Sequence, residues 1–387
     1  MLIHASKVNR IDSLLNSAVN NNEIPGAVAY INRSGKEVFH KAYGYRKLEN
    51  RVPMQKDDIF RMASMTKALT AVSVLQLNER GLLFLDDEVG KYIPEFRNPR
   101  VLIDVLPDSG FTSKPASGEI TIRQLLTHTS GIGYGFQDDR YNALVIKLNI
   151  SEGFEDDSRT SMENVLRIAK LPLLYEPGTK YTYGLSYDVL SVIIEIVSGM
   201  RFDKYVTQNI LKPLGMLDSY FVVPVEEQHR LVNIYEPLGD KLILTTYPDT
   251  AYPRIGTRQY FSGGADLCST AKDYGNFIQM VQNKGVYNNT RILGERFIEM
   301  MLSKQTQLDE GNSDQGFAAW VTNAKGAAEG PMSVGSFGFG GFWDTYSWAD
   351  PKKDFVAVLL LQMYPNNIHK IHEKFQFITY AVIDDFE

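Results

Sequence analysis

The chain has 387 residues, of which 44% are hydrophobic and 22% charged, and its formal net charge is −6. This composition is typical of a globular protein long enough for two domains, and the acidic balance excludes a basic surface for nucleic acid. A single cysteine, Cys268, excludes an internal disulfide framework and a cysteine-rich metal site. The six histidines show no metal-binding spacing, so we expect no metal and no cofactor.

The N-terminus lacks the basic region and long apolar core of a signal peptide. The longest apolar run, at 355–361, has the length of a strand and is far too short to cross a bilayer. These patterns predict a cytoplasmic protein that does not associate with membranes. The oligomeric state stays open at this point.

The first 62 residues predict a helix followed by a β-hairpin. Apolar residues recur with helical spacing at 8–19, and two strand-like runs at 27–31 and 37–44 flank a short turn. A second helix is expected from Ser64 to about Glu79, ahead of a glycine suited to a helix end. Helical patterns then dominate up to residue 218, at 121–130, 141–148, 162–169, 189–197 and 202–211, and a Pro-, Ser- and Gly-rich loop is expected at 107–118.

From residue 219 onwards, short β-branched and aromatic runs replace the helical pattern. Strands are expected at 220–223, 242–244, 316–321, 336–342, 345–350 and 355–361, and helices at 271–282, 295–302 and 374–384. Because strands occupy both ends of the chain, we expect one discontinuous α/β domain from residues 1–62 and 219–387. Residues 63–218 form a mostly helical domain in this interpretation. The fold class is α/β plus an all-helical insertion, with an antiparallel sheet flanked by helices and the active site at the domain interface.

Ser64 and Lys67 are the first candidates for chemistry. Residues three apart share one face of a helix, so the hydroxyl and the amine would point the same way. A neighbouring base is what a serine needs to become a nucleophile. The spacing alone is common, however, because a serine at a helix start is usually a cap and a lysine is usually solvated.

Four segments, which follow one another along the chain, strengthen the prediction that Ser64 and Lys67 are catalytic. They are Phe60-Arg61-Met62-Ala63-Ser64-Met65-Thr66-Lys67, Leu125-Leu126-Thr127-His128-Thr129-Ser130-Gly131, Pro177-Gly178-Thr179-Lys180-Tyr181-Thr182-Tyr183, and Ser336-Phe337-Gly338-Phe339-Gly340-Gly341. Together they resemble the serine hydrolases related to class C β-lactamases and D-Ala-D-Ala carboxypeptidases. The resemblance covers the chain from about residue 8 to residue 361 and implies a β-lactamase/DD-peptidase-like fold.

The resemblance implies a role for each matching residue. Ser64 corresponds to the acylated nucleophile, Lys67 to the amine beside it, and Tyr183 to the tyrosine of the second motif. The backbone N–H groups of Ser64 and Phe342 correspond to the oxyanion hole. Whether Lys67 or a Tyr183 phenolate takes the first proton stays open, because the two groups titrate together.

Two positions depart from the lactamase pattern. Leu185 replaces an asparagine and Phe339 replaces a cation or imidazole, so groups that would hold an amide and a substrate carboxylate are missing. At these two positions the chain resembles the branch of the family that hydrolyses carboxylic esters. The expected substrate pocket is formed by Phe339, Gly340, Gly341, Trp343, Leu185, Tyr134, Phe136 and Tyr260.

The leading prediction is therefore a carboxylesterase that cleaves small short-chain or aryl esters through an acyl-enzyme on Ser64. One alternative is a D-amino-acid peptidase or amidase, or a weak β-lactamase. Another is a penicillin-binding protein with little turnover. A conventional Ser-His-Asp hydrolase is disfavoured because the chain has no Gly-x-Ser-x-Gly nucleophile elbow.

Overall fold

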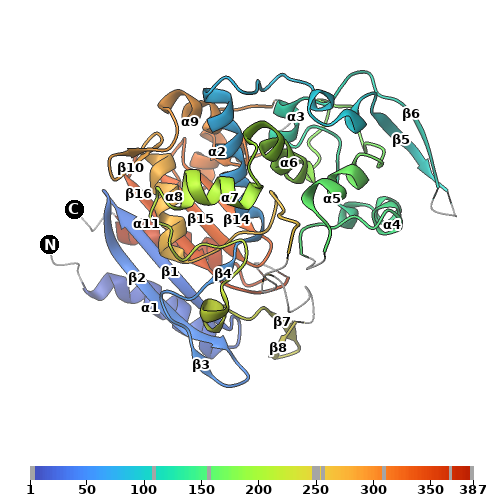
Figure 1. The fold of residues 1–387 in the computed structure, drawn as a ribbon. Coiled ribbons are helices and arrows are strands. Elements are labelled where there is room, and N and C mark those ends of the chain that lie inside the picture. Colours follow the sequence, from blue (N-terminus) through green and yellow to red (C-terminus); the bar gives the residue numbers. More distant parts are fainter. Residues whose placement is uncertain are drawn as a thin grey trace.

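The computed structural model describes residues 5–106, 110–154, 158–245, 253, 258–306, 311–365 and 368–383. Its largest feature is an eight-stranded antiparallel sheet with the strand order β12-β13-β14-β15-β16-β1-β2-β3 (Figure 1). In that order the strands are β12 (Ser313–Gln315), β13 (Trp320–Thr322), β14 (Phe337–Gly341), β15 (Thr345–Asp350), β16 (Phe355–Leu360), β1 (Gly26–Arg33), β2 (Lys36–Lys47) and β3 (Val52–Pro53).

The centre of this sheet joins the two ends of the chain. β1 pairs with β2 on one side and with β16 on the other, with Val28 opposite Leu360. The N-terminal hairpin and the C-terminal strands therefore form one continuous sheet, as the distribution of strand patterns along the sequence predicted.

Both faces of the sheet are buried. In β1, Ala27, Ala29 and Ile31 pack on one face with α1 (Ala5–Asn20) and α11 (Ile371–Ile383). Val28 and Tyr30 point to the opposite face, which α8 (Ala271–Gln282) covers. Because neighbouring residues of a strand point to opposite sides, a strand that is buried on both faces is apolar throughout.

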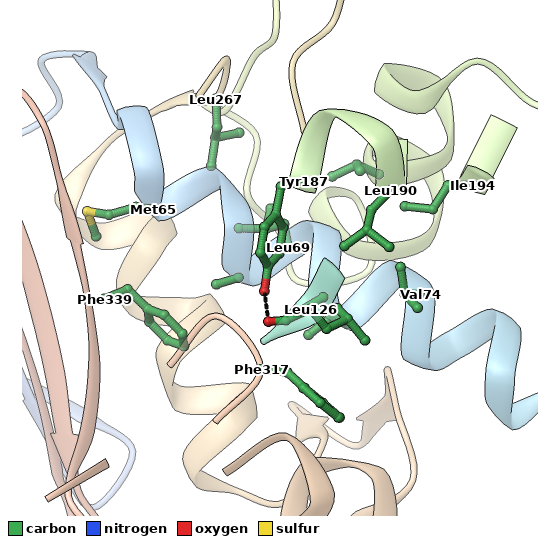
Figure 2. Close-up of a cluster of buried hydrophobic side chains, with 14 of the residues drawn as sticks. Met65, Leu69, Val74, Leu126, Tyr187, Leu190, Ile194, Leu267, Phe317 and Phe339 are labelled. Atoms are coloured by element: carbon green, nitrogen blue, oxygen red, sulfur yellow. Dashed lines mark hydrogen bonds between the residues drawn. The ribbon is translucent and has the colours of Figure 1, made fainter. Parts of the chain in front are cut away.

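Most of the remaining helices lie beside the sheet, next to the central helix α2 (Thr66–Glu79) or to the helices that pack on it (Figure 1), whereas α10 contacts β13. α2 is buried from Thr66 to Leu77, and α6 and α7 pack against it. Figure 2 shows Leu69 and Val74 of α2 among Tyr187, Leu190 and Ile194 of α6. The other helices are α3 (Ile122–Leu126), α4 (Asp139–Lys147), α5 (Ser161–Ile168), α6 (Ser186–Ser198), α7 (Phe202–Val206), α9 (Glu295–Leu302) and α10 (Ala324–Glu329).

Four short two-stranded ladders complete the described structure. They pair β4 (Phe60–Arg61) with β9 (Cys268–Ser269), β5 (Arg100–Val105) with β6 (Phe111–Pro115), β7 (Tyr235–Leu238) with β8 (Lys241–Leu244), and β10 (Val286–Tyr287) with β11 (Thr290–Arg291). The β4–β9 ladder ties the segment ahead of Ser64 to the segment ahead of α8.

Several details differ from the sequence predictions. Of the strand expected at 316–321, only Trp320 and Val321 lie in a strand, β13. Ser64 lies in a 3₁₀ turn, Ala63–Met65, and the α-helix begins only at Thr66. The segment expected as a loop at 107–118 contains β6, because backbone pairing with β5 overrides a composition typical of turns. The run at 220–223 contributes a single bridge, Tyr220 to Cys268, instead of a strand. The predicted end of the last helix at residue 384 lies outside the described residues.

The antiparallel sheet with helices on both faces agrees with the predicted architecture. We propose that the boundaries expected from the sequence, 1–62 with 219–387 and 63–218 between them, also delimit the two domains. None of the helices in the described ranges combines the length and the hydropathy needed to cross a lipid bilayer.

Candidate active site

The turn that carries Ser64 has an unusual backbone. Ala63 has a φ of 44°, in the left-handed region that alanine rarely adopts. The Thr66 hydroxyl donates to the Ala63 carbonyl at 2.6 Å and accepts a hydrogen bond from the Leu267 N–H at 3.0 Å. These bonds hold the turn in place and present the Ser64 side chain at the start of α2.

Lys67 is buried directly behind Ser64, with 3% of its surface exposed. Its Nζ donates to Ser64 Oγ at 3.1 Å, to the Gly264 carbonyl at 2.8 Å and to Tyr134 Oη at 3.3 Å. Burial raises the pKa of Tyr134 well above its usual value, so this tyrosine stays a neutral phenol. An ammonium group has three donors, and three oxygens surround this one. The arrangement therefore suits a charged Lys67.

Tyr183 approaches Ser64 from the segment ahead of α6. Its hydroxyl lies 2.6 Å from Ser64 Oγ, and Lys67 Nζ lies 4.7 Å from the centre of its ring. The ring also packs on His128, at 4.5 Å between centroids. Burial and the nearby Lys67 charge lower the pKa of His128 well below its usual value, so the imidazole is neutral and acts as a support for the tyrosine ring.

The third side of the site is the end of β14. Gly341 lies against the 3₁₀ turn, and a Cβ on it would overlap with the Met62 carbonyl and with Thr345 Oγ1. Gly340 has space, because its nearest neighbour would be Tyr346 Cδ2 at 3.7 Å. Glycine at position 341 therefore allows the close approach that brings β14 to Ser64.

We expect Gly341→Ala to reduce the free energy of unfolding by about 1–3 kcal/mol, because the added methyl must push β14 away from the turn. Gly340→Ala is the matched control and should change stability by less than about 0.5 kcal/mol. Urea unfolding of the two variants measures the difference. Equal stabilities would contradict the close packing described here.

A cavity of about 430 Å³ opens beside Ser64. One end holds the Ser64–Tyr183 pair and the glycines of β14, and the other end reaches the first turns of α11. Its lining residues are Ser64, Tyr183, Gly340, Gly341, Phe342, Asp344, Thr345, Tyr346, His372, Glu373 and Gln376. At the far end, His372 Nε2 donates to Asp344 Oδ1 at 2.6 Å, and both side chains are almost fully buried.

The predicted site residues separate into two groups. Ser64, Lys67 and Tyr183 converge, and Gly340, Gly341 and Phe342 line the same cavity. Tyr134 contacts Lys67, and Phe136 stacks on the Tyr134 ring but is largely exposed.

The remaining predicted pocket residues do not reach the cavity wall. Leu185 is fully buried in the core, and Tyr260 is buried with its hydroxyl donating to Asp188. Phe339 packs toward Phe277 of α8, and Trp343 is fully buried. Side chains alternate along a strand, so β14 turns Phe339 inward and offers the cavity the backbone of its glycines.

Sequence reasoning missed the far end of the cavity. Asp344, Tyr346, His372, Glu373 and Gln376 were not among the expected pocket residues, although the spacing of 372, 373 and 376 places them near one another at the start of a helix. Nothing in the local pattern indicates that this helix reaches the end of β14.

A buried antiparallel sheet, a helical region beside it and a serine, lysine and tyrosine meeting at the start of a buried helix define a class of serine hydrolases that includes the penicillin-recognising enzymes. The sequence model of the Beta-lactamase family matches residues 11–377, and the chain belongs to this family. The family and the fold class predicted from the sequence are therefore confirmed.

One named relative and two solved structures are similar to the chain over nearly its whole length. It is 30% identical to Esterase EstB of Burkholderia gladioli over 373 residues, which cover 92% of this chain and 90% of the relative. Among solved structures it resembles EstCE1, described as a hydrolase with promiscuous acyltransferase activity, with a TM-score of 0.81, 23% identity and 98% of both chains covered. Simvastatin synthase (LovD) from Aspergillus terreus gives a TM-score of 0.82 at 24% identity, covering 97% of this chain and 98% of the other.

Proposed function

We propose that the protein hydrolyses small carboxylic esters through an acyl-enzyme on Ser64. The observation that carries this proposal is the convergence of Tyr183 Oη and Lys67 Nζ on Ser64 Oγ, at 2.6 and 3.1 Å, beside a cavity. A serine activated by a hydrogen-bonded base is the arrangement that acyl transfer requires. The kinship with a named esterase supports the ester as the bond that is cleaved.

In this mechanism Tyr183 reacts as a phenolate: Ser64 Oγ attacks the ester carbonyl while its proton passes to the Tyr183 oxygen, which becomes a neutral phenol. Lys67 stays an ammonium in this mechanism and stabilises the negative charge of the phenolate, because its Nζ lies 4.7 Å from the centre of the Tyr183 ring. The backbone N–H groups of Ser64 and Phe342 bind the oxyanion, a contribution of roughly 2.7–4 kcal/mol for one donor. Tyr183 then returns the proton to the leaving alcohol, and a water that Tyr183 activates hydrolyses the acyl-enzyme.

The charged residues that line the cavity favour neutral esters as substrates over the anionic β-lactams and peptide C-termini. Among the residues that the structure describes, no lysine or arginine lines the cavity, whereas Asp344 and Glu373 do. A substrate carboxylate would lose its hydration there without gaining a cation. Leu185 and Phe339 are both buried, so the two positions that depart from the lactamase pattern offer no polar group either.

We therefore expect p-nitrophenyl acetate and butyrate to be hydrolysed with a kcat/KM at least about 100-fold higher than that for nitrocefin or a D-Ala-D-Ala peptide. Initial rates on this panel, measured with one preparation of folded protein, give the comparison. Faster turnover of nitrocefin or of the peptide would favour the lactamase or peptidase alternative. Acylation by penicillin without turnover of any ester would favour a penicillin-binding protein.

A further inference from the structure

Asp188 is a buried carboxylate close to the proposed catalytic residues. It lies in the first turn of α6, five residues after Tyr183, and is fully inaccessible to solvent. Its Oδ1 accepts a hydrogen bond from the Tyr260 hydroxyl at 2.7 Å. Its Oδ2 is also buried, and the Ser262 hydroxyl beside it is the second group that holds the carboxylate in its charged form. Two hydroxyl donors alone do not offset the cost of burying a carboxylate, so a positive charge is expected nearby.

The nearby positive charge is Lys67. The point at which a Gly264 Cβ would lie is 3.1 Å from Asp188 Oδ2 and 3.4 Å from Lys67 Nζ. The carboxylate and the ammonium therefore face each other across Gly264, within about 7 Å, in an interior where charges are only weakly screened. Because residue 264 is a glycine, no side chain separates the two groups.

The other buried charges in this region leave Asp188 available to Lys67. Arg258 pairs with Asp266, with Nη2 at 2.5 Å from Oδ2 and both side chains fully buried. Within 4.0 Å of Lys67 Nζ, the described residues provide no carboxylate. The titratable and charged groups that surround the Lys67–Asp188 pair are Tyr134, His128, Tyr183, Glu152, Tyr260, Arg258 and Asp266.

We propose that Asp188 is the counter-charge of Lys67, a positioning residue that keeps the lysine an ammonium and so leaves Tyr183 as the group that takes the proton of Ser64. This inference rests on the proposed function and deepens it. Burial raises the pKa of Asp188, while neighbouring hydroxyl groups and the Lys67 charge oppose that rise. The two buried charges thus stabilise each other, and neither side chain lines the cavity.

The test is the pH dependence of ester hydrolysis in Asp188→Asn. Loss of the negative charge makes the ammonium easier to deprotonate, so activity should disappear at a lower pH on the basic side of the profile. The same loss makes the Tyr183 phenol easier to ionise, so the acidic side should also move to lower pH. We expect both limbs of the kcat/KM profile to shift down by at least about one pH unit.

Tyr260→Phe is the matched control, because it removes the hydrogen bond to Asp188 and leaves the charge. Its pH profile should match that of the unmodified protein. Gly264→Ala provides a second variant if Asp188→Asn does not fold, since its methyl group would lie between the two charges and should shift both limbs in the same direction by a smaller amount. Circular dichroism and thermal unfolding confirm that each variant is folded.

An unshifted profile in a folded Asp188→Asn or Gly264→Ala protein, or a shift toward higher pH, would overturn the inference. Equal shifts in Asp188→Asn and Tyr260→Phe would assign the effect to the lost hydrogen bond and overturn it as well. These outcomes leave the proposed function standing, provided that activity still depends on Ser64. Full activity in Ser64→Ala would instead remove the function itself.

Discussion

Replacement of Ser64 by alanine is expected to reduce kcat for p-nitrophenyl butyrate by at least about 10⁴-fold, because without the hydroxyl no acyl-enzyme forms and the oxyanion hole alone gives little catalysis. The fold should survive, since the Ser64 side chain bonds only to Lys67 and Tyr183 among the described residues. The turn itself is held by Thr66, which the substitution leaves in place. Steady-state kinetics and thermal unfolding of the same preparation separate loss of chemistry from loss of structure.

The same serine should carry the label when the protein reacts with a phosphonate or a sulfonyl fluoride. Peptide mass spectrometry is expected to place the adduct on Ser64 and to find none in Ser64→Ala. An adduct on another serine, or a variant that keeps more than about a tenth of the activity, would contradict the assignment of the nucleophile.

Tyr183→Phe is expected to reduce kcat by about 10³-fold with little change in KM, because general acid–base catalysis is lost while the ring remains. Phenylalanine can still pack on His128, so the support of α6 should be preserved. Because the residual reaction lacks general acid–base catalysis, its pH profile should also flatten. Rates across about pH 5 to 11, a range that includes the ordinary pKa values of tyrosine and lysine, provide the measurement.

Tyr134→Phe is the control for this variant. The Tyr134 hydroxyl lies 3.3 Å from Lys67 Nζ and, within the described part of the chain, does not hydrogen-bond to Ser64. Removal of this hydroxyl should therefore reduce kcat by less than about tenfold. If Tyr134→Phe were the more damaging of the two substitutions, the proton transfer would have to be reassigned to Lys67 and Tyr134.

The part of the site that the sequence predicted is the part encoded in short motifs. Ser64 and Lys67 are one helical turn apart, and Tyr183 follows a recognisable turn, so their identities are local features. The family, the fold class and the broad class of serine ester hydrolase predicted from these motifs are confirmed by the relatives. The roles of the individual residues stay predictions until the variants above are measured.

The expected pocket depended on side-chain direction, which the motifs do not specify. Phe339 was expected to line the pocket, but it packs on Phe277 of α8 because the strand register turns it away from the cavity. Tyr260 is likewise drawn into the core by its bond to Asp188. A shift of one residue in strand register would reverse the direction of each side chain, and only long-range pairing fixes that register.

Other features depend on contacts between distant segments and have no local signal. Asp188 appears in the sequence as an acidic residue near the start of a helix, a common position that favours the helix dipole. Its relation to Lys67 arises only because Gly264, from a third segment, lies between them. The His372–Asp344 bond at the far end of the cavity is similarly set by how α11 meets β15.

The pairing of β1 with β16 has a consequence for folding during synthesis on the ribosome. The N-terminal strand is complete at Arg33, but its partner begins only at Phe355. At a synthesis rate of about 5–20 residues per second, the edge of β1 that pairs with β16 stays unpaired for roughly tens of seconds before β16 is made. β14, which completes the site beside Ser64, is made only shortly before that partner. Hydrolytic activity therefore requires synthesis at least as far as β14, and the unpaired edge of β1 is exposed to aggregation until β16 is made.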